Sequence, residues 1–285
     1  MNLKLRPGML TDASTCGPIC YEAFRTVSAQ HNFPPDIPSP ETAIGLFSML
    51  LGNPGFYSVV AELDGKVVGS NFLDERSTIA GVGPITIDPQ TQNRGIGRKL
   101  MEDVLNRAQE RAFPGVRLVQ AAYQGRSLSL YTSLGFDARE PLVTMQGPPP
   151  RKRISGWTVR PASEEDLDAC NQLCRNVHGH DRAGEVADAI GQGVATVVEH
   201  GGRITGYSTG IAFFSHSVAA TNDDLKALIS AAAEFGGPGF LLPMRNGELF
   251  RWCLANGLRV VQPLTLMSMG LYNEPSGAFL PSILY

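Results

Sequence analysis

An internal repeat is the feature that most limits the folds available to this chain of 285 residues. The stretch LRPGMLTDASTCGPIC, starting at Leu5, aligns with VRPASEEDLDACNQLC, starting at Val159. At one constant offset the two stretches share an Arg-Pro pair, an aspartate and two cysteines: Arg6, Pro7, Asp12, Cys16 and Cys20 in the first, and Arg160, Pro161, Asp166, Cys170 and Cys174 in the second. Later, DGKVVGS at Asp64 is echoed by GGRITGY at Gly201. Two halves built on one plan indicate a tandem duplication.

A break rich in proline and cations separates the two repeats. Residues 146–156, QGPPPRKRISG, place three prolines before three cations, a composition typical of a linker. We therefore expect a first domain over residues 1–147, a linker over 148–156 and a second domain over 157–285. A chain of this length accommodates two domains of ordinary size.

Hydrophobic periodicity and turn residues predict a mixed α/β order, in which each half opens with a short strand and a capped helix. In the first half, Ser39 is the expected cap of the second helix, and Asp64-Gly65 is the expected turn of a hairpin. Predicted helices cover residues 11–24, with a kink at Gly17-Pro18, and residues 37–53, 96–112 and 127–135. Predicted strands cover residues 57–63, 66–74, 80–88 and 116–123, and residues 207–214 in the second half.

Composition narrows the class of protein. With 43% hydrophobic and 18% charged residues, the chain resembles soluble globular proteins, and no window of about twenty apolar residues predicts a membrane span. The start MNLKLRPGML has no signal-peptide pattern, and a net charge of −3 gives no reason to expect binding to nucleic acid. We therefore expect neither nucleic acid nor membrane as a partner, and a cytoplasmic location.

The five cysteines are expected to act as small apolar side chains. Their odd number in a chain of this size argues against a disulfide framework. Two pairs lie four residues apart in helix-like sequence, which favours the buried faces of two helices. A zinc site is the alternative, but no His or Asp stands at ligand spacing nearby, so we expect no metal.

A glycine-rich turn, TQNRGIGRKL, begins at Thr91 and leads directly into an amphipathic helix. A P-loop is a poor match because no hydroxyl residue follows the lysine, and a dinucleotide fingerprint is a poor match because its third glycine is missing. The pattern Gln92-x-x-Gly95-x-Gly97 suits a pyrophosphate, since glycines let a ligand approach the backbone and the first helical N–H groups attract anions. A surface turn with ordinary capping explains these residues equally well.

The stretch ITIDPQTQNRGIGRKLMEDVL resembles the coenzyme A-binding motif of the GNAT acyltransferase superfamily, Gln/Arg-x-x-Gly-x-Gly/Ala. LYTSLGF, which contains Tyr131, resembles a second motif of that family, and the resemblance covers residues 3–145. It implies an α/β fold (α+β, mixed sheet) of two tandem GNAT-like domains, each with a central, mostly antiparallel sheet flanked by helices. It also implies acetyl-CoA as the acyl donor. The residues expected to hold the donor are Ile85, Thr86, Ile87, Gln92, Asn93, Arg94, Gly95, Ile96, Gly97, Arg98, Lys99 and Gln124, the last standing where the family usually carries Asn.

The resemblance further implies direct transfer of the acyl group from the thioester to an amine, with no covalent enzyme intermediate. Because proline lacks an N–H, Gly83-Pro84 should interrupt its strand and free a backbone N–H near Ile85 or Thr86 for the thioester oxygen. Tyr131 is the predicted general acid, since a phenol with a pKa of about 10 stays protonated at neutral pH. A purely structural packing role for its ring is the alternative.

The residues that handle the acceptor are predicted from their position alone. Glu75, near the end of the strand over residues 66–74, is the expected general base, acting through a water. His31 and Asp36 lie in the loop between the first two helices, where this family tends to line the acceptor site. Together with Glu41, Asp36 would attract a cationic acceptor.

The second half lacks the pattern of the glycine turn. At the corresponding helix start it carries Thr221-Asn222-Asp223-Asp224, and these carboxylates would repel a pyrophosphate. We therefore predict that the second domain does not bind the donor. Its expected roles are to complete the acceptor pocket, to brace the first domain or to form a homodimer.

The leading functional hypothesis is an acetyl-CoA-dependent N-acetyltransferase whose acceptor is a primary amine of a small molecule or a peptide. A non-catalytic acyl-CoA sensor that regulates a partner is the alternative, and a purely structural module is a third. Release of free thiol in the presence of amines distinguishes the enzyme from the sensor.

Overall fold

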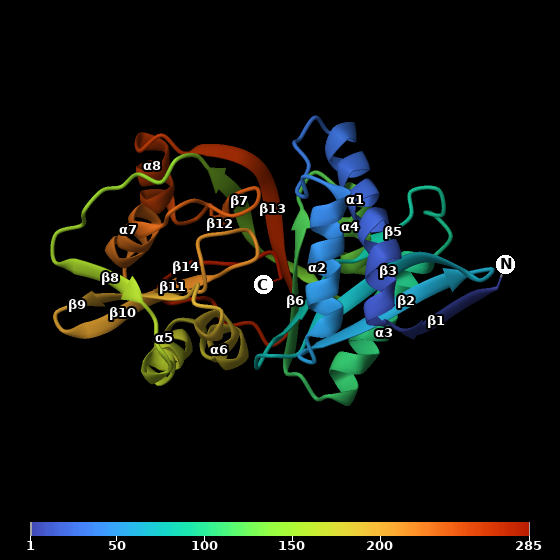
Figure 1. Ribbon diagram of the computed structural model, residues 1–285, viewed down its shortest axis with the longest axis horizontal. Helices are drawn as coiled ribbons and strands as arrows, with labels where there is room; N and C mark the ends of the chain where they lie inside the picture. The colour runs from blue at the N-terminus through green and yellow to red at the C-terminus, as the bar shows by residue number, and fades with distance from the viewer. Residues whose placement is uncertain (1, 285) are drawn as a thin grey trace.

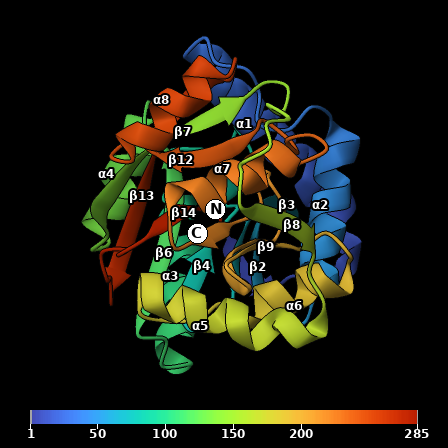
Figure 2. The same ribbon diagram turned by 90° about the vertical axis from the view of Figure 1, so that its left-hand side faces the viewer.

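The computed structural model describes residues 2–284, which form two halves that lie side by side with helices packed on their sheets (Figures 1 and 2). In the first half the helices are α1 (Ala13–Gln30), α2 (Pro40–Gly52), α3 (Ile96–Glu110) and α4 (Gly125–Ser133). Its strands are β1 (Leu3–Pro7), β2 (Phe56–Leu63), β3 (Lys66–Asp74), β4 (Ala80–Val82), β5 (Thr86–Ile87), β6 (Gly115–Ala121) and β7 (Asp137–Gln146).

The second half follows the same order from β8 (Trp157–Pro161) onward. Its helices are α5 (Leu167–His178), α6 (Ala183–Gly191), α7 (Asn222–Ala231) and α8 (Gly247–Ala255). Its further strands are β9 (Thr196–His200), β10 (Arg203–Ser208), β11 (Ser217–Ala219), β12 (Phe240–Pro243), β13 (Arg259–Gly270) and β14 (Ala278–Leu280). Within the described residues no helix combines the length and the apolar character that a membrane span needs.

The duplication is visible in matching ion-pair networks. Arg6 donates to Asp12 at 2.7 Å and to Glu62 at 2.6 Å. At the same place in the second half, Arg160 donates to Asp166 at 2.7 Å and to Glu199 at 2.8 Å. In each half the arginine thereby ties its first strand to the second strand and to the turn that starts the first helix, so the repeated Arg-Pro and Asp residues have a structural role.

Local sequence signals predict several element ends correctly. The Ser39 hydroxyl accepts the N–H of Thr42 at 3.2 Å, and Pro40 opens α2 as expected of a first-turn proline. Asp64 and Gly65 have φ values of +50° and +82° and connect β2 to β3 in a tight hairpin. All five cysteines are free and buried, in agreement with the expectation that they serve as small apolar side chains.

Three expected elements differ from the structure. The strand predicted over residues 80–88 is divided into β4 and β5 by Gly83-Pro84, where Gly83 has a φ of +137° and the peptide bond is cis. Helix α1 continues through Pro18, and Gly17 lets it approach α2 so closely that a Cβ there would lie 2.8 Å from the Cα of Ile44. The strand predicted over residues 207–214 ends at Ser208, after which the chain turns away toward the other half.

The two halves exchange strands, a feature the sequence analysis did not predict. The larger sheet has the order β1-β2-β3-β4-β6-β13-β7-β12 along the described chain, with β5 paired to β3. Strand β13 of the second half lies between β6 and β7 of the first half, and β7 in turn lies between β13 and β12 of the second half. The two expected domains therefore share one sheet.

The smaller sheet has the order β14-β11-β10-β9-β8. Strand β14 pairs with β11 over Ser217–Leu280, Val218–Phe279 and Ala219–Ala278, and it also packs against β12. By the order of elements, β11 and β12 correspond to the β4/β5 segment and β6 of the first half. The space between these two strands of the second half is thus filled by the chain itself.

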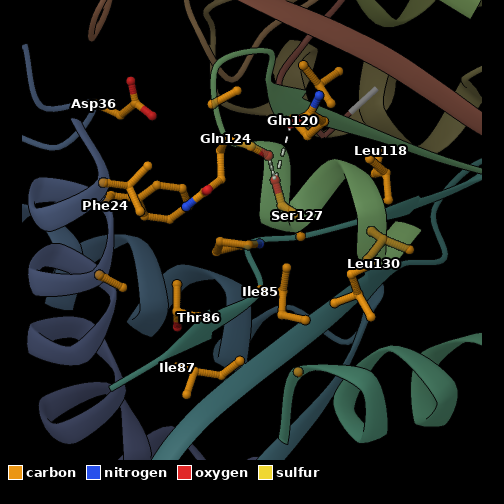
Figure 3. A pocket seen from close by; sticks show the side chains of 18 of the residues that line it. Phe24, Asp36, Ile85, Thr86, Ile87, Leu118, Gln120, Gln124, Ser127 and Leu130 are labelled. Atoms are coloured by element: carbon orange, nitrogen blue, oxygen red, sulfur yellow. Dashed lines mark hydrogen bonds between the residues drawn. The ribbon is translucent and has the colours of Figure 1, made fainter. Parts of the chain in front are cut away.

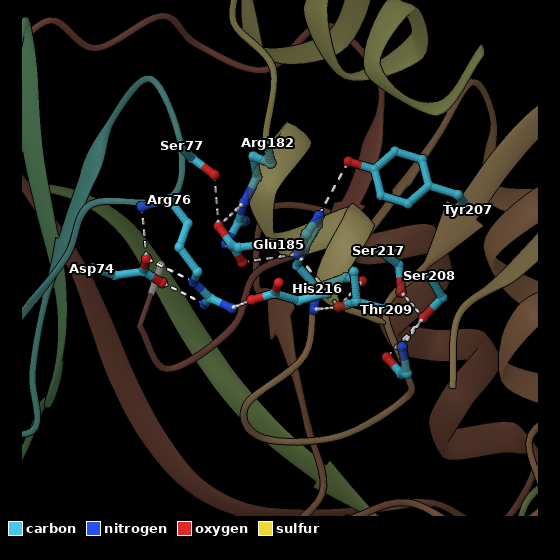
Figure 4. Close-up of polar contacts among 12 residues, drawn as sticks. Asp74, Arg76, Ser77, Arg182, Glu185, Tyr207, Ser208, Thr209, His216 and Ser217 are labelled. Carbon is cyan, nitrogen blue, oxygen red and sulfur yellow. Dashed lines mark hydrogen bonds and ion pairs between the residues drawn. The ribbon is translucent and has the colours of Figure 1, made fainter. Parts of the chain in front are cut away.

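Buried and half-buried polar side chains also join the two halves, between the end of β3 and α6 (Figure 4). Arg76 pairs with Asp74 of its own half at 2.5 Å and with Asp188 of α6 at 2.8 Å. Next to this pair, Glu185 accepts a hydrogen bond from the Ser77 hydroxyl at 3.3 Å. These contacts fix α6 of the second half against the end of β3.

Candidate active site

A pocket of about 460 Å³ opens where two parallel strands separate. Strands β4 and β6 pair only at Ala80–Val116 and Gly81–Arg117. Beyond this point residues 82–87 line one side of the pocket and residues 118–121 line the other. The break at Gly83-Pro84 therefore lies where the sheet opens, and Gly83, Pro84 and Ile85 line the pocket.

One end of the pocket is built by the glycine turn. Gly95 is the N-cap of α3 with a φ of +77°, and a Cβ there would meet open space. Gly97, in the first turn of α3, has no such room, because a Cβ would lie 2.9 Å from the Cδ1 of Ile87. The N–H groups at the start of the helix and its dipole favour an anion here.

Two guanidinium groups add full positive charge at this end. Among the described residues that line the pocket, Arg98 and Arg126 are the basic ones. Arg126, at the start of α4, donates to the Oδ1 of Asn93 in the glycine turn at 2.6 Å, and Arg98 donates to the Ser133 hydroxyl at 2.7 Å. The sequence analysis missed Arg126, because only the fold brings the start of α4 next to the glycine turn.

The middle of the pocket is lined by apolar side chains and a few polar ones (Figure 3). Thr86 Oγ1 and Gln120 Nε2 are buried, and neither has a hydrogen-bond partner in residues 2–284. Buried polar atoms without partners are uncommon in proteins, and a bound ligand is one explanation for them. A chain that carries amide groups between apolar segments, such as the pantetheine arm of coenzyme A, fits this lining.

Tyr131 of α4 lines the same pocket and packs its ring edge-on against Phe136, with 6.3 Å between ring centroids. Only 7% of the residue is exposed, and burial raises the pKa of its hydroxyl above the usual value. The phenol is therefore protonated at neutral pH, as a proton donor must be.

The other end of the pocket carries a carboxylate. Asp36 is the acidic residue among the described lining, and it lies beside α1 (Figure 3). Burial raises the pKa of Asp36 to about 6, and the hydrogen bond from the side chain of Gln262 partly opposes this shift. The Tyr123 hydroxyl donates in turn to Gln262 at 3.0 Å, which fixes the amide toward the carboxylate. A carboxylate with a pKa near neutrality is suited to accept a proton.

The pocket lining includes ten of the twelve residues predicted to hold the donor, namely Ile85, Thr86, Ile87, Gln92, Asn93, Gly95, Ile96, Gly97, Arg98 and Gln124. Arg94 and Lys99 lie outside this lining. His31 is exposed and outside this lining; its Nδ1 lies 2.9 Å from the carbonyl oxygen of Val27, and its ring packs beside that of Tyr123, which lines the pocket.

The structure does not bring Glu75 to the pocket, and the prediction that it supplies the base needs correction. Its carboxylate accepts hydrogen bonds from Arg107 at 2.7 and 3.1 Å, and Arg111 lies 3.8 Å away. Both arginines lie at the C-terminal end of α3, whereas the pocket lies at the N-terminal end. Glu75 is predicted as the base from its position after a strand. In the structure its carboxylate instead pairs with Arg107 and Arg111 at the far end of α3.

Comparison with known proteins agrees with this geometry. Residues 22–136, which contain the glycine turn and Tyr131, match the family model described as Acetyltransferase (GNAT) family. The first half of the chain is therefore similar to the GNAT family. A mycothiol acetyltransferase from Thermomonospora curvata is 34% identical to this chain over 92 residues, which are 32% of the chain and 31% of that relative. The match thus spans about a third of the relative's length.

Solved structures resemble this chain over both of its halves. A putative acetyltransferase from Pyrococcus horikoshii aligns with 99% of the chain and 94% of its own length, with a TM-score of 0.76 at 18% identity. A tandem GNAT protein from the clavulanic acid biosynthesis pathway aligns with 94% of the chain and 98% of its own length, with a TM-score of 0.56 at 15% identity. At these identities the likeness concerns the fold, which is that of two GNAT-like halves in tandem.

Proposed function

We propose that this chain is an N-acetyltransferase that moves an acetyl group from acetyl-CoA directly to the primary amine of a small molecule or peptide. One observation carries the proposal: a single pocket has two guanidinium groups and a helix N-terminus at one end and a carboxylate at the other. An anionic donor and a cationic acceptor would enter opposite ends and meet at the break in the sheet.

The donor end is suited to a diphosphate. N–H groups in the first turn of α3, together with Arg98 and Arg126, would hold it, and Thr86 and Gln120 would bond to the amides of the pantetheine arm. The bound donor supplies an acyl group activated as a thioester. Backbone groups near Ile85, beside the Gly83-Pro84 break, would lie close to the carbonyl oxygen and stabilise its developing charge.

The acceptor end is suited to an ammonium group. Asp36 would attract it and take up one of its protons, so that the nitrogen lone pair forms the new C–N bond as the C–S bond breaks. Tyr131 would give its proton to the departing thiolate. The second proton that the nitrogen loses would replace the one that Tyr131 gives up. Asp36 replaces Glu75 as the proposed base, because its carboxylate lies in the pocket and Glu75 is held by arginines elsewhere.

The second half would bind no donor molecule of its own. Strand β14 lies where the corresponding opening would be, and the carboxylate of Asp224 is used within the domain, accepting the indole N–H of Trp157 at 2.8 Å. Five buried free thiols support a reducing compartment such as the cytoplasm. Because the second half would hold no donor, its proposed roles are to complete the acceptor pocket and to form a homodimer.

Thiol release tests the proposal. Purified protein is incubated with acetyl-CoA and each member of a panel of primary amines, amino acids, polyamines and peptides. Free thiol should appear only when an amine is present, with one acetylated amine formed per thiol. If acetyl-CoA binds but no amine elicits thiol release, the chain is an acyl-CoA sensor and the proposed activity is wrong.

A further inference from the structure

We infer that the acceptor is an amine with an apolar substituent, which packs against a wall that the second half supplies. The inference rests on the proposed function and names the class of its acceptor. It comes from what the second half contributes to the pocket of the first.

The contribution of the second half to the pocket is entirely apolar within the described residues. It consists of five side chains: Phe213, Phe214, Leu264, Ile283 and Leu284. They come from three separate segments, which are the loop after β10, the exchanged strand β13 and the segment after β14. An apolar surface built from three segments is suited to an apolar substituent of a ligand, since burial of each methylene is favourable.

Residues 281–284 form a fixed part of this wall. Strand β14 anchors the segment, because it is paired with β11 in the smaller sheet. The N–H of Ile283 then donates to the carbonyl oxygen of Phe213 at 2.8 Å. The carbonyl oxygen of Leu284 lies so close to Gly81 of β4 that a Cβ at Gly81 would collide with it. The absence of a side chain at Gly81 therefore lets the segment reach the point where β4 and β6 separate.

The apolar wall lies next to the carboxylate end of the pocket. Leu284, which is 8% exposed, packs in one cluster with Ile37, the neighbour of Asp36, and with Cys20 of α1. Asp36 itself accepts a hydrogen bond from Gln262, two residues before Leu264 in β13. A ligand whose ammonium group is at Asp36 therefore has the wall beside it.

Charge in the pocket limits the polarity of the acceptor. Among the described lining residues, Asp36 is the acidic one, and the two arginines lie at the opposite end. A diamine, an amino acid or a hydroxylated amine would place a further charged or polar group against the apolar side chains of Ile283 and Leu284, which is costly. A singly charged alkylamine or arylalkylamine satisfies both the carboxylate and the wall.

The decisive experiment measures kcat/KM for amines of increasing apolar length at fixed acetyl-CoA. The series is ethylamine, butylamine, hexylamine and 2-phenylethylamine, with ethanolamine and 1,4-diaminobutane as polar counterparts of similar size. Because burial of one methylene contributes about 0.8 kcal/mol, kcat/KM should rise about fourfold per methylene until the wall is covered. The diamine should be poorer than butylamine by about tenfold or more.

Variants link this preference to the wall. Leu284→Ala and Phe214→Ala should lower kcat/KM for hexylamine about tenfold more than they lower kcat/KM for ethylamine. Leu284→Met, which conserves volume, should keep the preference. The matched control is Val194→Ala, an exposed apolar residue of the second half remote from the pocket lining. Thermal unfolding and acetyl-CoA titration of each variant establish that it is folded.

The outcomes separate this inference from the proposed function. If amines are acetylated but polar and apolar amines react equally well, or if Leu284→Ala and Phe214→Ala leave the ratio of hexylamine to ethylamine unchanged, the inference is wrong and the activity stands. The same holds if these variants alter the preference for butyryl-CoA over acetyl-CoA instead, since the wall would then contact the acyl chain. If no amine is acetylated, the proposed function itself fails.

Discussion

The side-chain amide of Gln262, in a strand of the second half, donates a hydrogen bond to the carboxylate of Asp36, in a loop of the first half. Gln262 is buried and is held in turn by the hydroxyl of Tyr123. The exchanged strand β13 therefore does more than join the halves, because it positions the carboxylate at the acceptor end of the pocket. The second half also supplies the apolar wall, and the two halves share the larger sheet, so both halves are needed to form the pocket.

Asp36→Asn should lower kcat/KM for the amine about 10²-fold, since it removes the proposed proton acceptor but keeps a group able to bond to Gln262. Burial holds the pKa of Asp36 near 6, and the base acts in its ionised form, so the wild-type rate should fall as the pH drops below about 6. This acid limb should disappear in the variant. A pH–rate profile of both proteins measures it, and an unchanged limb in Asp36→Asn would assign the titration to another group.

Stability should respond to Asp36 with the opposite pH dependence. The pKa of Asp36 is raised from its ordinary value of 3.8 to about 6 in the folded chain, so the native state binds this proton more tightly than the unfolded state. The contribution of protonated Asp36 to the free energy of unfolding is present at low pH and is lost as the pH rises through 6. Asp36→Asn should therefore be more stable than wild type at pH 8 and show less advantage at pH 5, as measured by denaturant unfolding.

Tyr131→Phe should lower kcat about 10²-fold with little change in the affinity for acetyl-CoA, because it removes the phenolic proton and keeps the ring that packs against Phe136. Single-turnover kinetics and calorimetric titration separate the two quantities. A variant with wild-type kcat would leave Tyr131 with a packing role only.

Gly97→Asp should weaken acetyl-CoA binding by about 10²-fold or more, because it places a negative charge at the proposed diphosphate site and a Cβ against Ile87. Gly191→Asp is the matched control, since that glycine ends α6 at the surface with no neighbour within 4 Å of a built Cβ. Calorimetric titration of acetyl-CoA into both variants measures the effect. Equal affinities in the two variants would exclude a diphosphate at Gly97.

Acid should destabilise the folded chain through His216, which lies beside the Arg182–Glu185 pair of the second half (Figure 4). Its ring lies 3.1 Å from the Tyr207 hydroxyl and 3.3 Å from Glu185, and burial, aided by Arg182, lowers the pKa of His216 to about 4. The unfolded chain binds this proton at its ordinary value of 6.5, so stability is full above pH 6.5 and falls toward pH 4.

The loss expected from His216 alone is about 3 kcal/mol over that range. Burial lowers the pKa values of His178 and His180 as well, which adds to the same trend. His216→Gln should reduce the slope of unfolding free energy against pH between 6.5 and 4 in denaturant titrations. A variant with the wild-type slope would show that His216 does not contribute to it.

Local patterns in the sequence predicted local structure well. Ser39 identified the start of α2 and Asp64-Gly65 the hairpin, because capping and turn formation depend on residues a few positions apart. The repeated Arg6 and Arg160 identified the duplication for the same reason, since each arginine acts within its own half. The glycine turn could be recognised in the sequence for the same reason, because its residues are contiguous in the chain.

Features that depend on distant segments could not be read in this way. Nothing near Arg259–Gly270 indicates that β13 inserts into the sheet of the other half, because an exchanged strand has the same alternation as one that stays in place. Glu75 was chosen from its place after a strand, and its partner Arg107 becomes visible only in three dimensions. Leu284 lay in an apolar segment whose docking site the sequence did not specify.

The most direct test of the account is a crystal structure of the chain with coenzyme A bound. The account predicts one coenzyme A per chain, with its diphosphate at the N–H groups that follow Gly95 at the start of α3 and its pantetheine arm between β5 and β6. Coenzyme A bound at α7 of the second half, or with its diphosphate away from the start of α3, would contradict it.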